Sequence, residues 1–403
     1  MNNDVMIIGG GAAGLSAALS ASGQGARVTV IEGAPRLGRK ILASGNGRCN
    51  LANAGEPRYY GEAAWALQVF SACPVTQVLA FFEELGLVAV EEAGGRIYPG
   101  CGQAAAVLDV LRAEIERRHI PVICEAPVAK LCQTSSGFRA DTPKGSFAAS
   151  RTIVACGGMA GGKLGHDGKA YQLLTGLGHT LIFPRPALTQ IEAEKRAVKG
   201  LSGLRLPARL TLCEGKRPVS AAQGEVLFTD YGVSGVCAMQ LSRDAEEMLA
   251  KGKQPTLYID FSPMLGIIPR VYDRVPAQDP EKNLPAVRAC IEKRRHILPP
   301  EGILTGLAPR LLSEKLRGLT AEQTARALAA YPVPITGVRG FEHAQVTSGG
   351  IACREFSPAT LESSLCPGLY CAGEMLNVDG DCGGFNLQFA FATGILAGKH
   401  AAE

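Results

Sequence analysis

The chain has 403 residues, 46% hydrophobic and 19% charged, with a formal net charge of +4. This length predicts two or three domains with large cores, and the lack of a basic block argues against nucleic acid as the main partner. No apolar run reaches the ~18 residues of a membrane helix, so no membrane partner is expected. The thirteen Cys are scattered without a C-x-x-C pair. We therefore expect neither a disulfide framework nor a metal site, and a cytoplasmic location is the simplest setting.

The first part of the chain predicts a strand, a helix and a second strand. Residues 5–8 are a short apolar run typical of a strand buried on both faces. Residues 12–22 are small and apolar without Pro, which favours a helix packed closely on a sheet. Residues 27–31 form a β-branched strand that ends at Glu32. This order is that of the first half of a Rossmann unit.

Three glycines and one acidic residue predict the ligand of this unit. Gly9, Gly11 and Gly14 form a G-x-G-x-x-G pattern between the first strand and the helix. The first permits the tight turn, the second lets the backbone approach a pyrophosphate, and the third lets the helix sit close to the strand. The helix start adds unpaired N–H groups and a positive dipole end. Glu32 stands where a carboxylate accepts hydrogen bonds from a ribose, so we expect a dinucleotide.

Residues 33–53 are rich in Gly, Asn and Ser and predict a loop. The loop brings cations close to the expected phosphate site, and its glycines let backbone N–H groups converge on an anion or on a flavin edge. A solvated basic loop is the alternative, although so many small polar residues are unusual for a connector. The residues concerned are Arg39, Lys40, Ser44, Gly45, Asn46, Gly47, Arg48, Cys49 and Asn50.

The pattern of predicted strands and helices changes twice along the chain. Strand and helix segments alternate over residues 1–187, which predicts an α/β domain. Residues 188–339 read as an insert, β-rich over 188–262 and mainly helical over 263–339. Residues 340–403 are again interrupted by glycines, and we expect them to complete the first domain. Helices are predicted at 65–85, 103–119, 169–177, 236–251, 284–296, 304–316 and 321–330, and further strands at 120–131, 138–149, 151–158, 190–212, 225–229, 256–261 and 337–342.

A second helix start follows a strand near the end of the chain. Residues 368–372 predict a short buried strand, and a glycine loop then leads into an apolar helix from about Phe385. One dinucleotide site does not need two helix starts, whereas a flavin dinucleotide does. The second positive end suits the N1–C2=O edge of a flavin, where it stabilises negative charge on the reduced ring. A C-terminal docking helix is the alternative.

Three stretches resemble the BaiN-like flavoproteins, a family of bacterial FAD-dependent oxidoreductases distantly similar to fumarate reductase flavoprotein subunits. They are residues 38–53 (GRKILASGNGRCNLAN), 224–235 (GEVLFTDYGVSG) and 373–394 (GEMLNVDGDCGGFNLQFAFATG). The resemblance extends over essentially the whole chain. It implies an α/β fold with a Rossmann-like FAD-binding domain of three layers (β/β/α), interrupted by the β-rich and helical insert.

The resemblance also implies which residues face FAD. No His, Cys or Tyr lies in a motif typical of a covalent flavin link, so we expect FAD to be held without a covalent bond. In the family, the first glycine turn, the acid after the second strand, the SGNGRCN loop and the GGFNLQ helix start line the cofactor, and the backbone at the position of Val128 contacts adenine. The corresponding residues here are Gly9, Gly11, Ala12, Ala13, Gly14, Glu32, Gly33, Arg39, Lys40, Ser44, Gly45, Asn46, Gly47, Arg48, Cys49, Asn50, Val128, Ala155, Gly157, Gly158, Gly373, Glu374, Gly384, Phe385, Asn386 and Leu387.

The chain departs from the family's pattern at five positions. The family commonly has His, Asp, Tyr, Trp and Pro where this chain has Asp230, Asn377, Phe385, Phe389 and Val236, respectively. The first two changes alter ionisable groups. The family's acid–base residues are therefore not carried over to this chain.

The resemblance implies an FAD-dependent reductase of a conjugated C=C bond in a small, enone-type molecule. A hydride would reach the substrate through flavin N5, and NAD(P)H would be a transient donor because only one dinucleotide pattern is present. Tyr231 is the candidate proton donor and Asp230 the second candidate. A phenol can protonate an enolate without bringing charge into an apolar pocket. A turn tyrosine packed before Gly232 is the alternative.

Two other functions fit the same residues. One is a flavin oxidase that uses O2 as acceptor. The other is a flavin-bearing redox sensor without turnover, for which the many Cys give a reason. Neither the physiological substrate nor the oligomeric state follows from the sequence.

Overall fold

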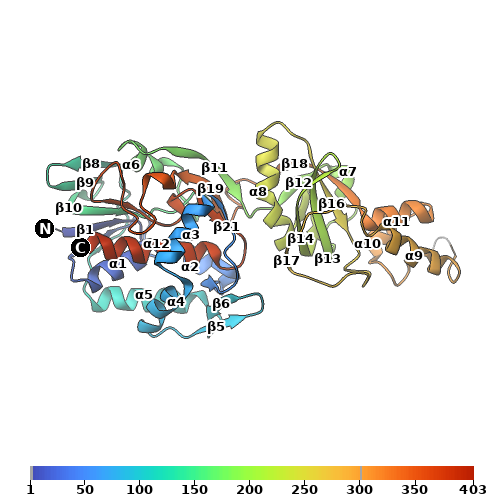
Figure 1. The fold of residues 1–403 in the computed structure, drawn as a ribbon, viewed down its shortest axis with the longest axis horizontal. Helices are drawn as coiled ribbons and strands as arrows, with labels where there is room; N and C mark the ends of the chain where they lie inside the picture. Colours follow the sequence, from blue (N-terminus) through green and yellow to red (C-terminus); the bar gives the residue numbers. More distant parts are fainter. Residues whose placement is uncertain (1–2, 300–301) are drawn as a thin grey trace. The chain divides into compact units, whose positions relative to one another are not determined.

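The computed structural model describes residues 3–299 and 302–403 and divides into two compact units (Figure 1). Unit 1 comprises Met1–Arg185 and Val346–Glu403, and unit 2 comprises Pro186–Gln345. Each unit has a hydrophobic core of its own. The sequence places the two boundaries at 187/188 and 339/340, so the insert ends a few residues later than expected.

A Rossmann-type parallel sheet forms the centre of unit 1. Its parallel strands follow the order β7-β2-β1-β10, and β20 pairs with β10 on the side away from β1. Residues 5–8 of β1 and all of β2 are buried, as a sheet covered on both faces requires. The bounds are Asn3–Ile8 for β1, Val28–Ile31 for β2, Val122–Ile123 for β7, Gly145–Val154 for β10 and Leu369–Cys371 for β20.

The register of this sheet makes four strands end at nearly one level. Ile8 lies opposite both Ile31 and Val154, and Val154 lies opposite Cys371. The segments that follow β1, β2, β10 and β20 therefore share the carboxyl edge of the sheet. In open α/β sheets this is the edge that binds ligands.

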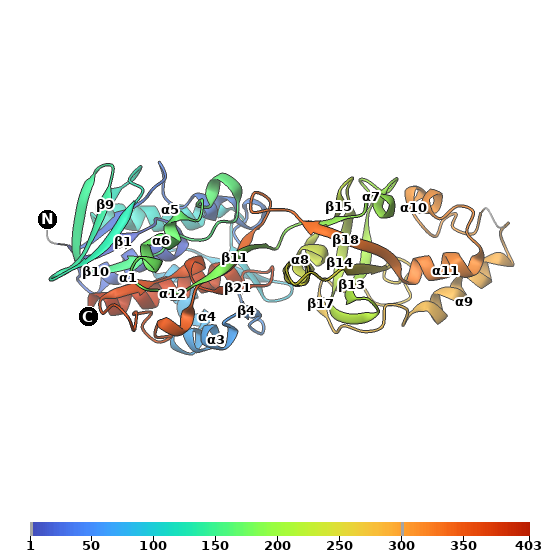
Figure 2. The same ribbon diagram turned by 90° about the horizontal axis from the view of Figure 1, so that it is seen from above.

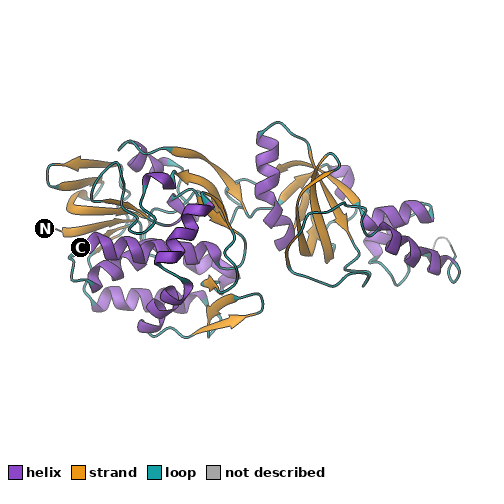
Figure 3. Ribbon diagram, viewed as in Figure 1, coloured by secondary structure: helices purple, strands orange, loops and turns teal. Residues whose placement is uncertain are grey.

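Two helices from opposite ends of the chain pack side by side on the sheet (Figures 1 and 3). They are α1, Ala12–Gly23, and α12, Phe385–Ala402. A Cβ atom built on Gly394 would lie 2.1 Å from Ser16 Oγ, and one built on Gly398 would lie 2.2 Å from Ala17 O. Only glycine allows this approach. Because the contacts advance in the same direction on both helices, the helices run parallel.

The connection from β7 to β10 contains strands in place of a crossover helix. β8 (Lys130–Thr134) and β9 (Gly137–Thr142) form an antiparallel meander with the first half of β10. α5 (Ala104–Arg117) precedes β7 and packs against α1. The fold class predicted from the sequence, a Rossmann-type α/β unit with an additional β-rich unit, is confirmed.

The single helix predicted over 65–85 is wrong. Pro74 cannot continue a helix, and the segment forms α3 (Ala63–Ala72) and α4 (Val75–Glu84) instead. Within the described ranges, no one helix has the length and apolar character to cross a membrane. The bent pair α3 and α4, at 50° to one another, meets those two criteria only when taken together.

One further segment of unit 1 differs from expectation. The loop predicted over 33–53 contains a short helix, α2 (Arg39–Ala43), followed by a 3-10 turn, Ser44–Gly47, and by β3 (Ala52–Asn53). The glycine pair at 349–350 lies inside a buried strand, β19 (Val346–Ile351), which belongs with β11 (Leu181–Ala187) in a two-stranded sheet.

Unit 2 is built on an antiparallel sheet that closes on itself (Figures 2 and 3). Its strands follow the order β13-β16-β18-β12-β15-β14, and β14 pairs again with β13. β17 adds to the outside of β14, and α8 packs on β14. The bounds are Ile191–Ala193 for β12, Arg205–Glu214 for β13, Arg217–Phe228 for β14, Gly232–Ser234 for β15, Pro255–Asp260 for β16, Asp273–Val275 for β17, Tyr331–Val338 for β18, Lys195–Val198 for α7, Val236–Ala250 for α8, Leu284–Arg295 for α9, Arg310–Lys315 for α10 and Ala321–Ala329 for α11.

The strand predicted at 337–342 is misplaced, because β18 runs from Tyr331 to Val338 through the middle of the sheet. Pro332 and Pro334 lack N–H groups, and proline is unusual in a central strand. In an antiparallel strand alternate residues direct their polar backbone atoms to opposite neighbours. Glu194 N–H donates to Pro334 O (3.0 Å), so both prolines direct these atoms towards β12. Val333, between them, remains free to bond β16.

The close packing of α1 on α12 predicts the effect of one methyl group. Gly394→Ala should destabilise the protein by about 1–3 kcal/mol, because the added carbon overlaps Ser16 Oγ and the helices must separate. Gly340→Ala is the control, since a Cβ there meets no heavy atom within 4 Å. Urea unfolding of the three proteins measures the difference. Equal stability of Gly394→Ala and Gly340→Ala would contradict the packing.

Candidate functional site

The carboxyl edge of the parallel sheet gathers most of the segments that the sequence assigned to a cofactor. Gly9 N–H donates to Ile31 O and Ala155 N–H donates to Ile8 O, each at 2.8 Å, so the chain leaves neighbouring strands at the same height. The expected residues at or next to this edge are Gly9, Gly11, Ala12, Ala13, Gly14, Glu32, Gly33, Ala155, Gly157, Gly158, Gly373 and Glu374.

The three glycines of the first turn have different surroundings. Gly9 has φ +110°, and a Cβ there would lie 2.4 Å from Ala155 O. A Cβ on Gly14 would lie 1.8 Å from Gly9 O. A Cβ on Gly11 would meet no heavy atom within 4 Å. The protein's own packing therefore requires the first and third glycines, whereas the second faces open space, as the approach of a ligand requires.

Glu32 is held in place by backbone groups on both sides. Its Oε2 accepts Gly10 N–H and its Oε1 accepts Ala34 N–H, each at 2.6 Å. Each carboxylate oxygen keeps a second lone pair for a ligand hydroxyl. Ala126 N–H donates to Glu32 O (2.9 Å), so the segment that leads to Val128 runs beside the residues after β2.

Glu374 connects four segments of unit 1. Its carboxylate accepts hydrogen bonds from Lys40 Nζ (2.6 Å), Thr347 N–H (2.8 Å) and Gly158 N–H (3.3 Å). Thr347 Oγ1 in turn accepts Ala160 N–H (3.0 Å). Lys40 is thus paired with a carboxylate, so its charge is already compensated without a phosphate.

The turn after α2 has a backbone suited to an anion. Gly45, Asn46 and Gly47 have φ of +56°, +54° and +82°, and Cys49 has φ +56°. Turns of this kind direct successive N–H groups to one side and form a concave polar surface. Cys49 itself is buried, and burial raises the pKa of its thiol to about 11. Its side chain therefore packs as a neutral thiol.

Asn50 offers an unsatisfied acceptor close to the start of α12. Within the described part of the chain, its Oδ1 is buried and accepts no hydrogen bond. A Cβ on Gly384 would lie 2.7 Å from this oxygen. A buried acceptor without a donor is unfavourable by about 1–3 kcal/mol. The position therefore suits a ligand N–H or O–H.

Arg48 is engaged with a neighbouring hairpin. Its guanidinium lies 4.1 Å from the ring centre of Tyr98 and forms an ion pair with Glu92 (2.5 Å). Glu92 belongs to β5, Ala89–Glu92, and Tyr98 to β6, Arg96–Pro99. A phosphate contact by Arg48 would require this arrangement to open.

The starts of α1 and α12 are both free of side-chain caps. Gly394 lies beside Ala13. Gly394 is nine residues after the first residue of α12, whereas Ala13 is one residue after the first residue of α1. At 1.5 Å per residue the two helix starts are therefore offset by about 12 Å along parallel axes. Asn386 fixes the loop before α12, because its Oδ1 accepts Gly380 N–H (2.8 Å) and its Nδ2 donates to Gly380 O (2.9 Å). The N–H groups of both helix starts remain available.

The two catalytic candidates belong to unit 2, whereas all cofactor candidates belong to unit 1. Tyr231 and Asp230 form the turn between β14 and β15, half-buried and exposed respectively. Thr229 N–H donates to Gly232 O (2.9 Å), and Gly232 N–H donates to Thr229 Oγ1 (3.1 Å). The turn is thus closed by its own hydrogen bonds and presents both side chains.

Sequence reasoning missed two residues next to the glycines after β10. Thr347 bonds that segment as described above. His166 Nδ1 accepts Gly168 N–H (2.9 Å), so its Nε2 carries the proton and donates to Gly157 O (2.9 Å). Burial lowers the pKa of His166. A His within a glycine-rich stretch and a Thr before a glycine pair were the available signals.

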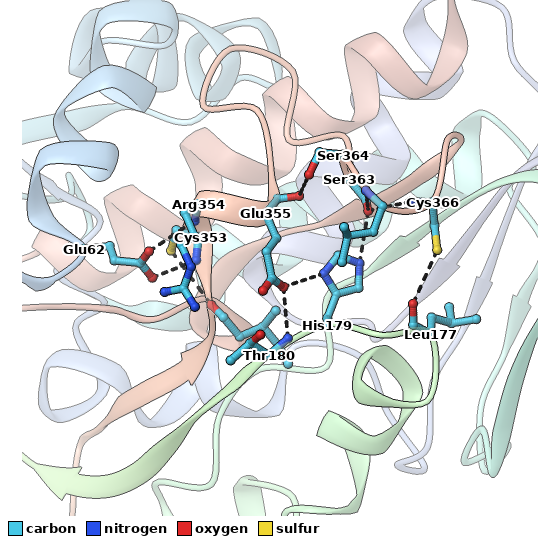
Figure 4. Close-up of polar contacts among 12 residues, drawn as sticks. Glu62, Leu177, His179, Thr180, Cys353, Arg354, Glu355, Ser363, Ser364 and Cys366 are labelled. Atoms are coloured by element: carbon cyan, nitrogen blue, oxygen red, sulfur yellow. Dashed lines mark hydrogen bonds and ion pairs between the residues drawn. The ribbon is translucent and has the colours of Figure 1, made fainter.

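A second polar cluster in unit 1 has the pattern of a Ser–His–acid triad (Figure 4). Glu355 Oε2 lies 3.0 Å from His179 Nδ1, and Ser363 Oγ lies 3.0 Å from His179 Nε2. However, Ser363 Oγ also accepts the N–H groups of Leu365 (3.0 Å) and Cys366 (2.9 Å), and Ser363 and His179 are buried. The N–H groups of an oxyanion hole would have to be free. The cluster is therefore a structural connection.

The fold defines an α/β protein whose Rossmann-type unit is interrupted by a second unit. The chain matches the HI0933-like protein Rossmann domain family over residues 3–400 and belongs to that family. It is a flavoprotein and a flavin-dependent oxidoreductase.

Two relatives and one solved structure are similar over nearly the whole chain. A 3-dehydro-bile acid delta(4,6)-reductase of Clostridium scindens is 36% identical, with 100% of this chain and 99% of the relative covered. A ribosomal RNA dihydrouridine synthase of Escherichia coli is 26% identical, with 97% and 96% covered. The open conformation of a flavocytochrome c3 fumarate reductase superposes with a TM-score of 0.51 at 16% identity, covering 100% of this chain and 78% of that one, which shows a shared fold. The resemblance stated from the sequence is confirmed.

The buried His179 predicts a pH-dependent stability. Burial lowers its pKa from the ordinary 6.5 despite the nearby Glu355, so the folded protein holds it neutral. The contribution of neutral His179 to the free energy of unfolding is present above about pH 6.5. It is lost as the pH falls towards the lowered pKa, because the unfolded chain then binds the extra proton. His179→Asn should cost about 1–3 kcal/mol at neutral pH. Its unfolding free energy should decline less than the parent's between about pH 7.5 and 5.5; an equal decline would contradict the assignment.

Proposed function

We propose that the chain binds FAD without a covalent bond at the carboxyl edge of unit 1. In this proposal it uses the cofactor to reduce a C=C bond conjugated to a carbonyl group. The observation that carries the proposal is the offset of about 12 Å between the uncapped starts of α1 and α12. A pyrophosphate suits the first positive end and the N1–C2=O edge of a flavin suits the second, with the ribityl chain between them. The reductase named for the 36% identical relative supports the substrate class.

Residues of this chain fit the cofactor at four points. The open space before Gly11 admits a pyrophosphate, and the lone pairs of Glu32 accept ribose hydroxyl groups. The buried, unsatisfied Asn50 Oδ1 accepts a donor from the ligand. The left-handed turn at Gly45 and Gly47 adds backbone N–H groups. Thr347 and His166 contact the same glycine loop and complete the set of residues that shape the edge.

The reaction requires one hydride and one proton. FAD, held by the edge residues named above, would supply the hydride that the β-carbon of the conjugated bond accepts, and NAD(P)H is the proposed source of electrons for the flavin. Tyr231 gives its hydroxyl proton to the carbon next to the carbonyl group, and the resulting phenolate recovers a proton from water. Asp230 is the second candidate for the proton.

Ribosomal RNA is the second candidate substrate. The 26% identical relative is named as a dihydrouridine synthase, and the C5=C6 bond of uridine is also conjugated to a carbonyl group. Unit 2 contains 22 Lys and Arg against 17 Asp and Glu, whereas unit 1 contains 19 against 20. The positive charge of the chain thus belongs to the insert, which favours an anionic substrate there. Reoxidation of the reduced protein by a steroid enone or by unmodified ribosomal RNA distinguishes the two substrates.

The cofactor proposal predicts selective loss of FAD. Gly11→Val should abolish tight FAD binding because its side chain occupies the pyrophosphate space. The apo-protein should lose only about 1 kcal/mol, the cost of an apolar helix cap, since no chain atom is displaced. Glu32→Ala should weaken FAD by about tenfold or more through the lost charged hydrogen bond. Flavin fluorescence titration and apo-protein unfolding measure the two quantities. Unchanged FAD affinity in both variants would place the dinucleotide elsewhere.

The proton-donor proposal predicts an effect on one half-reaction. Tyr231→Phe should slow reoxidation of the reduced flavin by an enone about a hundredfold, while reduction by NAD(P)H is unaffected. Tyr272→Phe is the matched control, because Tyr272 is an exposed tyrosine of the same unit. Stopped-flow absorbance follows each half-reaction. Equal slowing of both, or of neither, would leave Tyr231 as a packing residue.

The same experiment decides between the remaining functions. Reoxidation by O2 faster than by any conjugated acceptor would indicate an oxidase. A flavin that NAD(P)H does not reduce, in a protein without steady-state turnover, would indicate another electron donor or a redox sensor.

A further inference from the structure

Tyr231 is in contact with a cluster of charged side chains at one end of the closed sheet of unit 2. The guanidinium carbon of Arg339 lies 4.7 Å from the centre of the Tyr231 ring. The strand between them explains why they meet. Glu192 of β12 lies opposite Gly232 on one side and Gly337 on the other, so the ends of β15 and β18 are brought together across β12.

Arg339 is held from several directions. Its N–H donates to Gln190 O (2.9 Å), which continues the pairing of β18 with β12. Its Nε lies 3.8 Å from Glu192 Oε1, and its side chain is 30% exposed. Its Nη2 bonds His343 Nε2, four residues further along the chain. These contacts fix the plane of the guanidinium over the ring of Tyr231.

The bond to His343 defines a protonation state. A guanidinium has only donors, so His343 Nε2 must accept and Nδ1 must carry the ring proton. A protonated imidazole has no lone pair and would place a second positive charge beside Arg339. The other ionisable groups near the cluster are Glu192 on β12, Glu342 beside His343 and Asp230 beside Tyr231. The contact of His343 with Arg339 therefore exists only while His343 is neutral.

These contacts contribute little to the stability of the fold. A cation over an aromatic ring at a partly exposed site contributes about 0.5–1 kcal/mol, and a partly exposed ion pair contributes about as little. Together they nevertheless orient one phenol ring and place a positive charge beside it. Positive charge there favours the phenolate that remains after Tyr231 gives up its proton.

We infer that Arg339 is a positioning residue for proton transfer by Tyr231, and that neutral His343 holds Arg339 in place. This inference rests on the proposed function. In the step concerned, the O–H bond of Tyr231 breaks and a C–H bond forms at the carbon next to the substrate carbonyl, while the hydride comes from the reduced flavin. Protonation of His343 releases Arg339 and slows that step.

The first test needs no turnover. In the full-length protein, ¹⁵N shifts of labelled histidine should show His343 as the Nδ1–H tautomer, with its signal assigned by loss in His343→Gln. Arg339→Ala should return His343 towards the Nε2–H tautomer that prevails in a histidine side chain in water. An Nε2–H tautomer in the parent, or no change in Arg339→Ala, would overturn the inference.

The second test is a pH profile of reoxidation by a steroid enone. In the parent, the rate should fall when His343 is protonated, because its contact with Arg339 is then lost. His343→Gln keeps an oxygen acceptor for Arg339 but has no imidazole to protonate, so its profile should lack this fall. Arg339→Ala should be about tenfold slower or more at neutral pH, and should lose the pH dependence. Reduction by NAD(P)H should show neither effect.

The outcomes separate this inference from the proposed function. If Tyr231→Phe reoxidises at the parent's rate, the proton-donor assignment is wrong, and the inference about Arg339 and His343 is overturned as well. If Tyr231→Phe is slow but Arg339→Ala and His343→Gln behave like the parent, only the positioning role is overturned.

Discussion

The candidate site of this protein depends on the register of four parallel strands. Because β1, β2, β10 and β20 end at nearly one level, the segments after them share one edge although they come from distant parts of the chain. Glycines then decide how closely these segments approach. Gly9 admits Ala155, Gly14 admits Gly9, and Gly394 brings α12 against α1. The register and the glycines together place two uncapped helix starts on parallel axes, with an offset of about 12 Å along those axes.

The polar groups around this edge are arranged so that few charges are unpaired. Lys40 is bonded to Glu374, and Arg48 is paired with Glu92. Asn377, which stands where the family commonly has Asp, likewise avoids an unpaired charge. Its Nδ2 donates to Glu62 Oε2 (3.2 Å), which also accepts Cys353 N–H (2.7 Å). A carboxylate at 377 would face a second carboxylate at this distance, so the amide suits this chain.

Unit 2 has a different construction, with its own core inside a closed antiparallel sheet. Closure removes free strand edges and leaves strand ends and turns as the places where polar side chains gather. Tyr231, Arg339 and Glu192 meet at one such end. Asp230 and Tyr231 form a turn of the same unit.

The sequence by itself determined the first Rossmann unit, the second helix start and the presence of an insert. These depend on spacings within about thirty residues, such as the G-x-G-x-x-G turn before α1 and the acid after β2. Only the tertiary structure decided which partners the charged residues take, that Pro332 and Pro334 lie in a central strand, and that Arg339 covers Tyr231. Those contacts join residues far apart in the chain, and strand order and register, which no local pattern encodes, determine which of them meet.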